Sequence, residues 1–302
     1  MRRTAVPLLL LALLAGCGGS GGGKQPHAEP GTLAAFLDRP GPDVAAVQGT
    51  SDYAVGEVRV TFLVVDRQAR LISRPRARFL VARSLGAKAL VTTTALLEPI
   101  GIPGRSEAAT GGARSIYVAR FRIASPGKYA FVAQPDGAAI QVVGNLQVAR
   151  HPTAPAVGDR AIPSRTPTLA STHGDLAALT TATPPDRSLL RYSVAGSLAA
   201  HVPFVLVFAT PKFCTSRTCG PVVDVVRAVQ RRFAGRGIRF IHVEIYTDNN
   251  PAQGQNRWVR EWRLPSEPWV FVVGRDGRIK ARFEASVSVS ELAAAVRTVA
   301  AG

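Results

Sequence analysis

Short apolar runs recur between residues 43 and 150, and in several of them polar residues occupy every second position. The alternation is plain in Arg120-Phe121-Arg122-Ile123, where the apolar residues fall on one face of an extended chain. Turn-forming residues such as Pro126-Gly127 and Pro135-Asp136-Gly137 separate the runs. The pattern predicts an all-β unit over this stretch.

Seven strands are expected in this unit, at 44–48, 58–65, 76–82, 89–96, 116–123, 128–133 and 140–148. Seven short strands in about 100 residues without a cysteine resemble an immunoglobulin-like β-sandwich. Tyr129 follows a Pro-Gly turn, where such folds place a tyrosine-corner hydrogen bond. The unit holds no histidine and no catalytic constellation, so a spacer or binding module is expected.

Beyond residue 188 the apolar runs lengthen and acquire helical spacing. Residues 202–208 carry no charge, which suits a strand buried on both faces. Pro221 is well placed to open the helical pattern of 221–233. The expected order is a helix at 188–200, the strand 202–208, the helix 221–233, a strand at 238–246, a helix at 256–262, hairpin strands at 269–273 and 278–283, and a helix from the Ser288/Glu291 capping box. This order predicts an α/β unit at 188–302, joined to the β unit by the Pro- and Thr-rich linker 151–187.

The three cysteines are Cys17, Cys214 and Cys219. Cys214 and Cys219 occur where the strand 202–208 hands over to the next helix. The N-terminal end of a helix carries partial positive charge, which favours a thiolate over a thiol. The pair therefore indicates a redox dithiol.

Cys17 belongs to a different pattern. Arg2-Arg3 and the apolar stretch 5–14 have the character of an export leader, and Leu14-Ala15-Gly16-Cys17 resembles the bacterial lipobox. That resemblance implies a signal peptide at 1–16, a lipid on Cys17, a lipidated tether at 17–42, and a location on the extracytoplasmic face of the cell membrane. An ordinary cleaved leader with a chance cysteine is the alternative.

The composition adds little specificity. The hydrophobic content of 46% fits globular cores, and no stretch after the leader is long enough to span a membrane. The net charge is +17, but the arginines are scattered, so attraction to anionic lipids or wall polymers is expected and nucleic-acid binding is not. No nucleotide, flavin or haem motif is present, and neither a cofactor nor a metal is expected.

The element order of the second half, with cysteines after the first core strand and a proline before the third, resembles the thioredoxin fold, in particular the exported, membrane-anchored thioredoxin-like proteins of the TlpA type. The matching segments are Val205-Leu206-Val207-Phe208, Phe213-Cys214, Cys219-Gly220-Pro221, Pro268-Trp269-Val270-Phe271 and Arg275-Asp276-Gly277-Arg278-Ile279. The resemblance implies a thiol–disulfide oxidoreductase that acts on protein thiols and disulfides. Cys214 would attack and Cys219 would resolve the mixed disulfide.

The same resemblance implies a cis bond between Glu267 and Pro268. It also implies an apolar docking surface formed by Phe213, Pro268 and Trp269, with Glu267 beside them. Two nearby cations, Lys212 and Arg217, are expected to stabilise the thiolate.

The chain departs from that family in the spacing of its cysteines, which is Cys-x4-Cys instead of Cys-x-x-Cys. On an ideal helix such residues point about 140° apart. Cys214 must therefore lie in the loop ahead of the helix, or the first turn must unwind on oxidation. Alternatively, Cys219-Gly220-Pro221-Val222 aligns with the family's motif, and Val222 replaces its second cysteine.

The family's buried acid is a further departure, because Val207 stands near its place. Glu267 is the one carboxylate expected near the sulfurs. It either accepts the proton of the resolving thiol or is simply solvated.

Three other functions fit parts of the pattern. The pair could be a structural disulfide in a non-catalytic binding module, although so short a loop gains little stability from a crosslink. A peroxiredoxin-like peroxidase uses a similar cysteine spacing, but Pro211 occupies the place where that family needs a threonine, and Thr210 is one position off. A copper-binding metallochaperone would combine the two thiolates with His242, a strand histidine among apolar neighbours.

Overall fold

The computed structural model describes residues 28–38, 41–105, 113–137 and 139–300. The predicted leader, Cys17 and the first part of the tether lie outside the described residues. Within the described ranges, no helix is both long and apolar enough to cross a bilayer.

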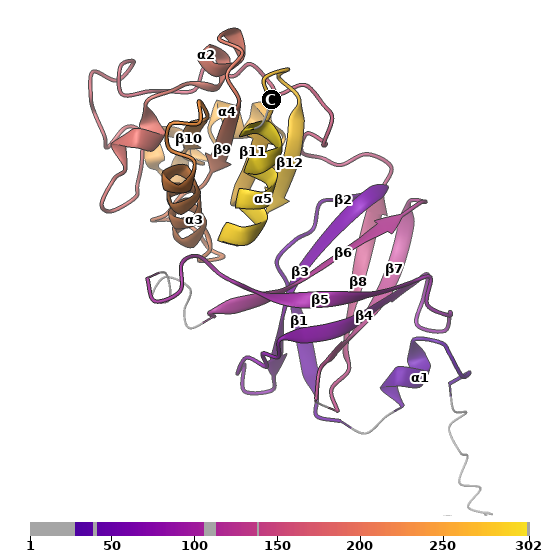
Figure 1. Cartoon of the computed structure of the whole chain (residues 1–302). Helices are drawn as coiled ribbons and strands as arrows, with labels where there is room; N and C mark the ends of the chain where they lie inside the picture. The colour runs from indigo at the N-terminus through magenta and orange to yellow at the C-terminus, as the bar shows by residue number, and fades with distance from the viewer. Residues whose placement is uncertain (1–27, 39–40, 106–112, 138, 301–302) are drawn as a thin grey trace, which may run out of the picture.

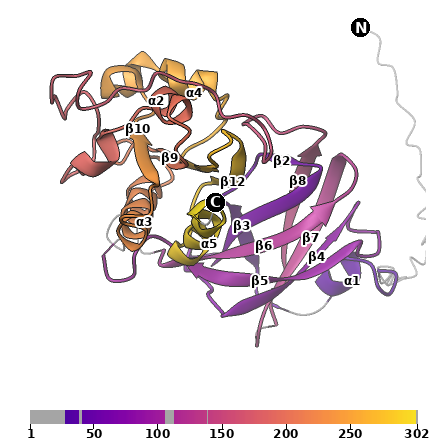
Figure 2. The same ribbon diagram turned by 45° about the horizontal axis from the view of Figure 1, so that its top comes forward.

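Eight strands of the N-terminal unit form one hydrogen-bonded sheet, in the order β1-β3-β6-β5-β4-β7-β8-β2. They are β1 (Val44–Gln48), β2 (Tyr53–Ala54), β3 (Gly56–Asp66), β4 (Arg76–Ala82), β5 (Val91–Pro99), β6 (Ser115–Ile123), β7 (Gly127–Pro135) and β8 (Val142–Ala149). The sheet curls around one apolar core, and the short helix α1 (Ala34–Leu37) lies at the end remote from the C-terminal unit (Figure 2).

All seven predicted strands are present in this unit. The two-residue strand β2 was not predicted, because two residues are too short to show a period. The strands form one continuous, curled sheet, whereas a sandwich has two separate sheets. The hydroxyl of Tyr129 donates to the carbonyl of Ser125 at 2.6 Å, which confirms the predicted tyrosine-corner contact.

The C-terminal unit is a four-stranded sheet in the order β10-β9-β11-β12 with helices on both faces (Figure 1). Its elements are the 3-10 helix η1 (Arg187–Leu190), α2 (Val194–Ala199), β9 (Phe204–Phe208), α3 (Cys219–Arg232), β10 (Arg239–Val243), the 3-10 helices η2 (Thr247–Asn249) and η3 (Pro251–Gln253), α4 (Arg257–Glu261), β11 (Trp269–Val273), β12 (Ile279–Glu284) and α5 (Val289–Ala300). β9 and β10 are parallel, whereas β11 is antiparallel to both β9 and β12.

The central strand β9 has both faces buried, as its uncharged sequence predicted. Val205 and Val207 pack into the core shared with α3 and α5. Phe204, Leu206 and Phe208 pack into a second core on the opposite face, which includes Trp262. The sheet is therefore rigidly held where β9 ends.

Two predicted boundaries were wrong. The single helix expected at 188–200 is divided into η1 and α2, because Ser193 is extended and its hydroxyl caps a new helix by accepting the N–H of Gly196 at 3.0 Å. Helix α3 begins at Cys219, two residues before Pro221. The cysteine is consequently the first residue of the helix.

The predicted linker 151–187 contains no helix or strand, apart from the first residue of η1, but it packs along the C-terminal unit. Gly158 and Asp159 bond to both backbone groups of Ile279, which covers the outer edge of β12. Ala154 and Leu179 are buried in this segment. It is thus part of the C-terminal unit's surface instead of a free spacer.

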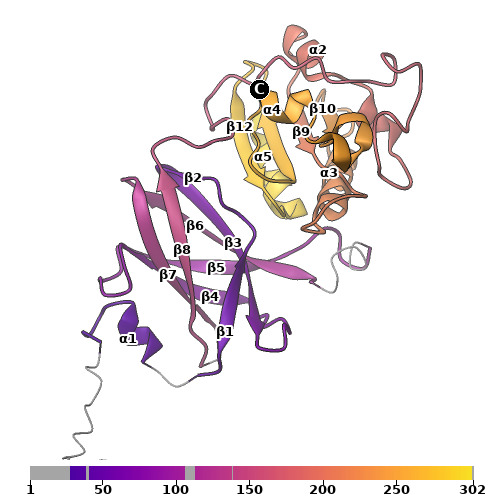
Figure 3. The same cartoon turned by 180° about the vertical axis from the view of Figure 1, so that it is seen from behind.

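The two units lie side by side, with α5 and β12 toward the N-terminal sheet (Figures 1 and 3). Arg59 of β3 makes a bidentate ion pair with Glu291 of α5, both distances being 3.0 Å, and Arg120 of β6 contacts the same carboxylate. Arg282 of β12 pairs with Asp52 at 2.7 Å. Arg120 is half exposed, whereas the other four side chains of these ion pairs are largely shielded from water. The shielded ion pairs therefore hold the interface in one geometry.

Glu291 also completes the predicted capping box of α5: its carboxylate accepts the N–H of Ser288 at 3.1 Å, and the hydroxyl of Ser288 accepts the N–H of Glu291 at 3.2 Å. Burial raises the pKa of Glu291, but the charge and hydrogen bonds of Arg59 outweigh it and hold the pKa below its ordinary value. The carboxylate thus stabilises the helix end and the interface together.

We predict that Glu291→Gln lowers the free energy of unfolding by about 3 kcal/mol, because it leaves Arg59 buried without its counter-charge. Because the folded-state pKa is depressed, this stabilisation is present above the ordinary glutamate pKa of about 4 and disappears as the pH falls through the folded value. Urea unfolding at several pH values measures it. Glu57→Gln, in an exposed ion pair with Arg122, is the matched control and should cost under about 1 kcal/mol. Equal costs for the two variants would contradict the interpretation.

Candidate functional site

The two cysteines lie at the carboxyl end of β9, where a loop leads into α3. Cys219 is the first residue of the helix, and Cys214 lies in the loop, as the spacing required. Both thiols are free. Cys219 is buried in the core between the sheet and α3, whereas Cys214 is only partly buried. The pair therefore has one sulfur within reach of a partner and one behind it.

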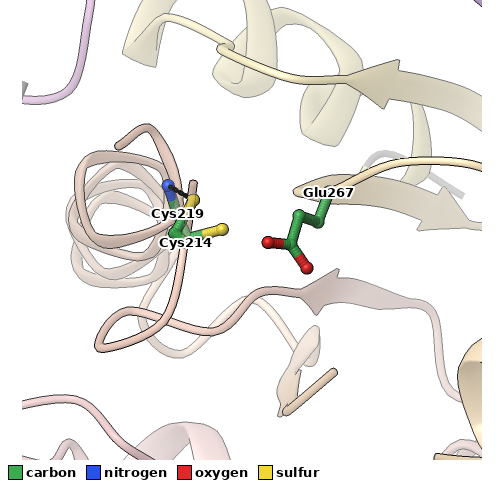
Figure 4. A group of neighbouring side chains, drawn as sticks. All are labelled: Cys214, Cys219 and Glu267. Carbon is green, nitrogen blue, oxygen red and sulfur yellow. Dashed lines mark hydrogen bonds between the residues drawn. The ribbon is translucent and has the colours of Figure 1, made fainter. Parts of the chain in front are cut away.

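The loop folds back so that the sulfur of Cys214 faces the start of α3. The backbone N–H of Cys219 donates to the Cys214 Sγ at 3.2 Å (Figure 4). The hydroxyl of Ser216 lies 3.3 Å from the same sulfur and 2.8 Å from the hydroxyl of Thr218. The first N–H groups of a helix have no partner inside the helix, so they are available to a thiolate.

These contacts separate the two pKa values. A hydrogen bond from the Cys219 thiol, with help from Ser216, outweighs burial and lowers the pKa of Cys214 to about 6. Burial, together with the hydrogen bond to Cys214 and its negative charge, raises the pKa of Cys219 well above its ordinary value. At neutral pH Cys214 is a thiolate and Cys219 a thiol, which is the protonation expected of an attacking and a resolving cysteine.

Glu267 lies beside the sulfurs, as predicted, and its bond to Pro268 is cis, which confirms that expectation. Its carboxylate and both sulfurs lie within 4.8 Å of one another, and Figure 4 shows the carboxylate facing the sulfurs from the loop before β11. Burial and the negative charges of Cys214 and Glu244 raise the pKa of Glu267 to about 7. The carboxyl group thus exchanges protons in the neutral range.

The predicted roles of Lys212 and Arg217 find no support in the contacts around Cys214. Hydrogen-bond donors from Cys219, Ser216 and Thr218 set its lowered pKa, and the two cations are not among the leading causes. The ammonium of Lys212 lies 5.3 Å from the centre of the Phe213 ring, and Arg217 occupies a left-handed turn position with φ of 59°. The helix start takes over the role assigned to the cations.

The docking surface also differs from the prediction. Phe213 and Glu267 are partly exposed, but Pro268 and Trp269 are buried. Trp269 begins β11 and its ring stacks on Phe271 in the core opposite α3, so it cannot touch a partner. Every residue of β11 is buried, so Trp269 is covered whichever face of the strand it takes, and the sequence did not show that this cover extends to the first residue of the strand.

Several residues of the site were missed by sequence reasoning. The hydroxyl of Ser216 contacts the sulfur of Cys214 directly, and Thr218 contributes through its backbone N–H and through its hydroxyl, which bonds to that of Ser216. Tyr246 packs edge-on against Phe213 with ring centres 6.4 Å apart. Glu244 influences the pKa of Glu267 from the end of β10. Glu244 and Tyr246 lie just after β10, which only the fold brings to the site.

His242, the third ligand of the copper hypothesis, is buried in β10. Its Nε2 donates to the carbonyl of Ala209 at 2.9 Å, and its Nδ1 faces the hydroxyl of Thr180 at 3.4 Å. Both ring nitrogens are therefore engaged within the protein. Glu267 takes the place beside the sulfurs that the hypothesis gave to His242.

The solved structures that resemble parts of this chain include three distant neighbours. No family model and no curated protein sequence matches the chain. A thiol:disulfide interchange protein of the thioredoxin family from Chlorobium tepidum TLS is 16% identical, covers 34% of this chain and 84% of its own, and has a TM-score of 0.28. The filamin domain of Lin-41 is 12% identical over 37% of this chain and 97% of its own, with a TM-score of 0.23. The PKD domain of the human VPS10 domain-containing receptor SorCS2 is 19% identical over 46% and 95%, with a TM-score of 0.18.

We predict that iodoacetamide at pH 7 modifies Cys214 and spares Cys219. With a pKa of about 6, Cys214 is thiolate over thiol by about ten to one at that pH, and its alkylation rate should fall as the solution is acidified through pH 6. Peptide mass spectrometry locates the label, and a chelator keeps both thiols free of metal. Ser216→Ala should move the midpoint upward, because it removes a donor to the thiolate. Faster labelling of Cys219 would contradict the assignment.

Proposed function

We propose that the C-terminal unit has a thioredoxin-like fold of the TlpA type and catalyses thiol–disulfide exchange with protein partners. The observation that carries the proposal is the asymmetry of the pair. Cys214 is partly exposed and has a lowered pKa, and its sulfur accepts a hydrogen bond from the backbone N–H of Cys219. The thiol of Cys219 is buried behind it. Low-pKa, accessible thiols are the reactive ones, whereas structural cysteines are buried and inert.

The reaction proceeds in two balanced steps. The Cys214 thiolate attacks one sulfur of a partner disulfide, forms a mixed disulfide and releases the partner's first thiolate. Cys219 then loses its proton and attacks the Cys214 sulfur, which releases the partner's second thiolate and leaves a Cys214–Cys219 disulfide. Two electrons pass to the partner. The reverse sequence oxidises a partner dithiol.

Glu267 is the proton acceptor in this scheme. Its carboxylate lies within 4.8 Å of both sulfurs, and a group with a pKa of about 7 can take the proton that Cys219 must lose. The partner's backbone would rest on the partly exposed side chains around Cys214, namely Phe213, Tyr246 and Glu267. The lipid on Cys17 would hold this unit at the extracytoplasmic face of the membrane, as the lipobox implies.

Trapping of the mixed disulfide tests this function. Reduced Cys219→Ala, mixed with a disulfide-bonded protein such as insulin, should accumulate a covalent adduct through Cys214, because the resolving step is removed. Non-reducing electrophoresis and peptide mapping identify the bond.

Cys214→Ala is the matched control and should form no adduct, since Cys219 is buried and protonated. An adduct on Cys219 would invert the roles. No adduct in either variant would contradict the exchange function and leave a structural disulfide or a metal site as explanations of the pair.

A second function, binding of a metal ion, is favoured by the same three donor atoms. Ligands at about 2.1–2.3 Å from a tetrahedral zinc ion lie about 3.8 Å apart, and the sulfurs and carboxylate lie within 4.8 Å of one another. Two thiolates with a carboxylate suit zinc better than copper(I), which prefers soft ligands throughout. A bound ion would occupy both sulfurs, so exchange and metal binding exclude each other at any moment.

Zinc titration of the reduced full-length chain against a chromophoric chelator tests the metal function. If the ion uses all three donors, binding is one to one and Glu267→Gln weakens it by at least about tenfold. Glu57→Gln, far from the sulfurs on the N-terminal unit, should leave the affinity unchanged. Equal affinities for wild type and Glu267→Gln, or no binding, would remove this function.

A further inference from the structure

Glu284, at the end of β12, is the one acidic side chain that joins the N-terminal unit to the loop before β11 among the hydrogen bonds of the described residues. It is 7% exposed. From the N-terminal unit it accepts the backbone N–H groups of Ser51 and Asp52, each at 2.9 Å, and the hydroxyl of Ser51 at 2.8 Å. From the other side it accepts the hydroxyl of Ser266 at 2.7 Å. Three of its four donors thus belong to the unit that holds no sulfur.

Ser266 directly precedes Glu267, so the carboxylate of Glu284 fixes the loop that carries Glu267. The Ser266 hydroxyl also accepts the indole N–H of Trp269 at 3.2 Å, and the carbonyl of Pro268 accepts the N–H of Ala285 at 2.9 Å. The loop is therefore tied at both ends to the end of β12, at its last residue Glu284 and at Ala285, which follows it. Its outer anchor is the turn around Ser51.

That turn is itself held firmly. The carboxylate of Asp52 accepts the N–H of Thr153 at 2.8 Å and pairs with Arg282 at 2.7 Å. The guanidinium of Arg282 lies 4.9 Å from the centre of the Trp269 ring. The hydroxyl of Thr50 accepts the N–H of Thr61 in β3 at 2.9 Å. Covalent bonds and hydrogen bonds thus run without interruption from β3, through residues 50–52 and Glu284, to the loop before β11.

A buried carboxylate is stable only while its oxygens are hydrogen-bonded. Oε1 of Glu284 accepts the hydroxyls of both Ser51 and Ser266, so without the Ser51 hydroxyl this oxygen would keep Ser266 as its one remaining donor among the described residues. It would then move toward water, and Ser266 would move with it.

We propose that the N-terminal sheet unit positions the carboxylate of Glu267 beside the two sulfurs through the hydrogen-bonded chain Ser51–Glu284–Ser266, and that these three are positioning residues for the resolving step. The proposal rests on the proposed thiol–disulfide exchange for its kinetic consequence. It gives the β-rich unit a role in the chemistry of the other unit, which a simple spacer would not have.

The two half-reactions can be separated with Ellman's reagent, an aromatic disulfide. Attack by Cys214 releases the first chromophoric thiolate, and attack by Cys219 on the mixed disulfide releases the second. Ser51→Ala and Ser266→Ala should slow the second release by about two- to thirtyfold and leave the first nearly unchanged, in the same sense as Glu267→Gln. Ser266→Thr, which keeps the hydroxyl, should restore the rate.

A double-mutant cycle distinguishes positioning from a general loss of stability. In the Glu267→Gln background, adding Ser51→Ala should change the second release no further, because the group it positions is already gone. Glu57→Gln, also on the N-terminal unit, is the control and should behave as wild type. Circular dichroism verifies that each variant is folded. Wild-type kinetics in folded Ser51→Ala, or undiminished effects in the Glu267→Gln background, would overturn the proposal.

The rate of Cys214 alkylation at fixed pH provides a readout that does not need exchange. Ser51→Ala and Ser266→Ala should alter it in the same sense as Glu267→Gln, because the carboxylate stands beside that sulfur. If wild type does not release the second chromophoric thiolate, the proposed exchange function is wrong. The same double-mutant cycle, measured by the rate of Cys214 alkylation, still tests whether the N-terminal unit positions Glu267. If wild type exchanges normally and neither rate changes in the serine variants, the positioning alone fails.

Discussion

The hydrogen bond from the backbone of Cys219 to the sulfur of Cys214 is the contact on which the account of the site depends. Four residues separate the cysteines, and on a continuous helix they would face different directions. The chain avoids this by starting α3 at Cys219, so the four residues form a loop that returns the sulfur to an unpaired helical N–H. The thiolate then acts as a cap of the helix.

The rest of the C-terminal unit explains why this contact is asymmetric. β9 is buried on both faces and ends just before the loop, so Cys219 enters the packed core beside Val222 and Val270 while Cys214 stays at its edge. Burial disfavours a charge on the inner sulfur, and hydrogen bonds favour a charge on the outer one. The same fold brings the loop before β11 across the site and places Glu267 against the pair. Burial and hydrogen bonds, more than nearby cations, set the pKa values of the two thiols.

The elements with a strong pattern could be predicted from sequence, and the contacts between distant elements could not. The uncharged run of β9, the capping box at Ser288 and the seven N-terminal strands follow from local chemistry. The cysteine pair was found from its place between a strand and a helix, whereas the cis bond between Glu267 and Pro268 came from a resemblance in motif and order. The prediction that Trp269 contacts a partner was wrong, because the elements that cover both faces of β11 reach its first residue. The bond between Ser51 and Glu284 joins residues more than 200 positions apart, and nothing in either segment announces it.

The reduction potential of the Cys214–Cys219 pair, measured in a glutathione buffer with chelator present, decides whether the pair exchanges disulfides or crosslinks the fold. A low-pKa attacking thiol stabilises the reduced form, so we expect a potential between about −270 and −120 mV, the range of exchange-active dithiols. A potential below about −300 mV would mark a structural disulfide and exclude thiol–disulfide exchange as the role of the pair.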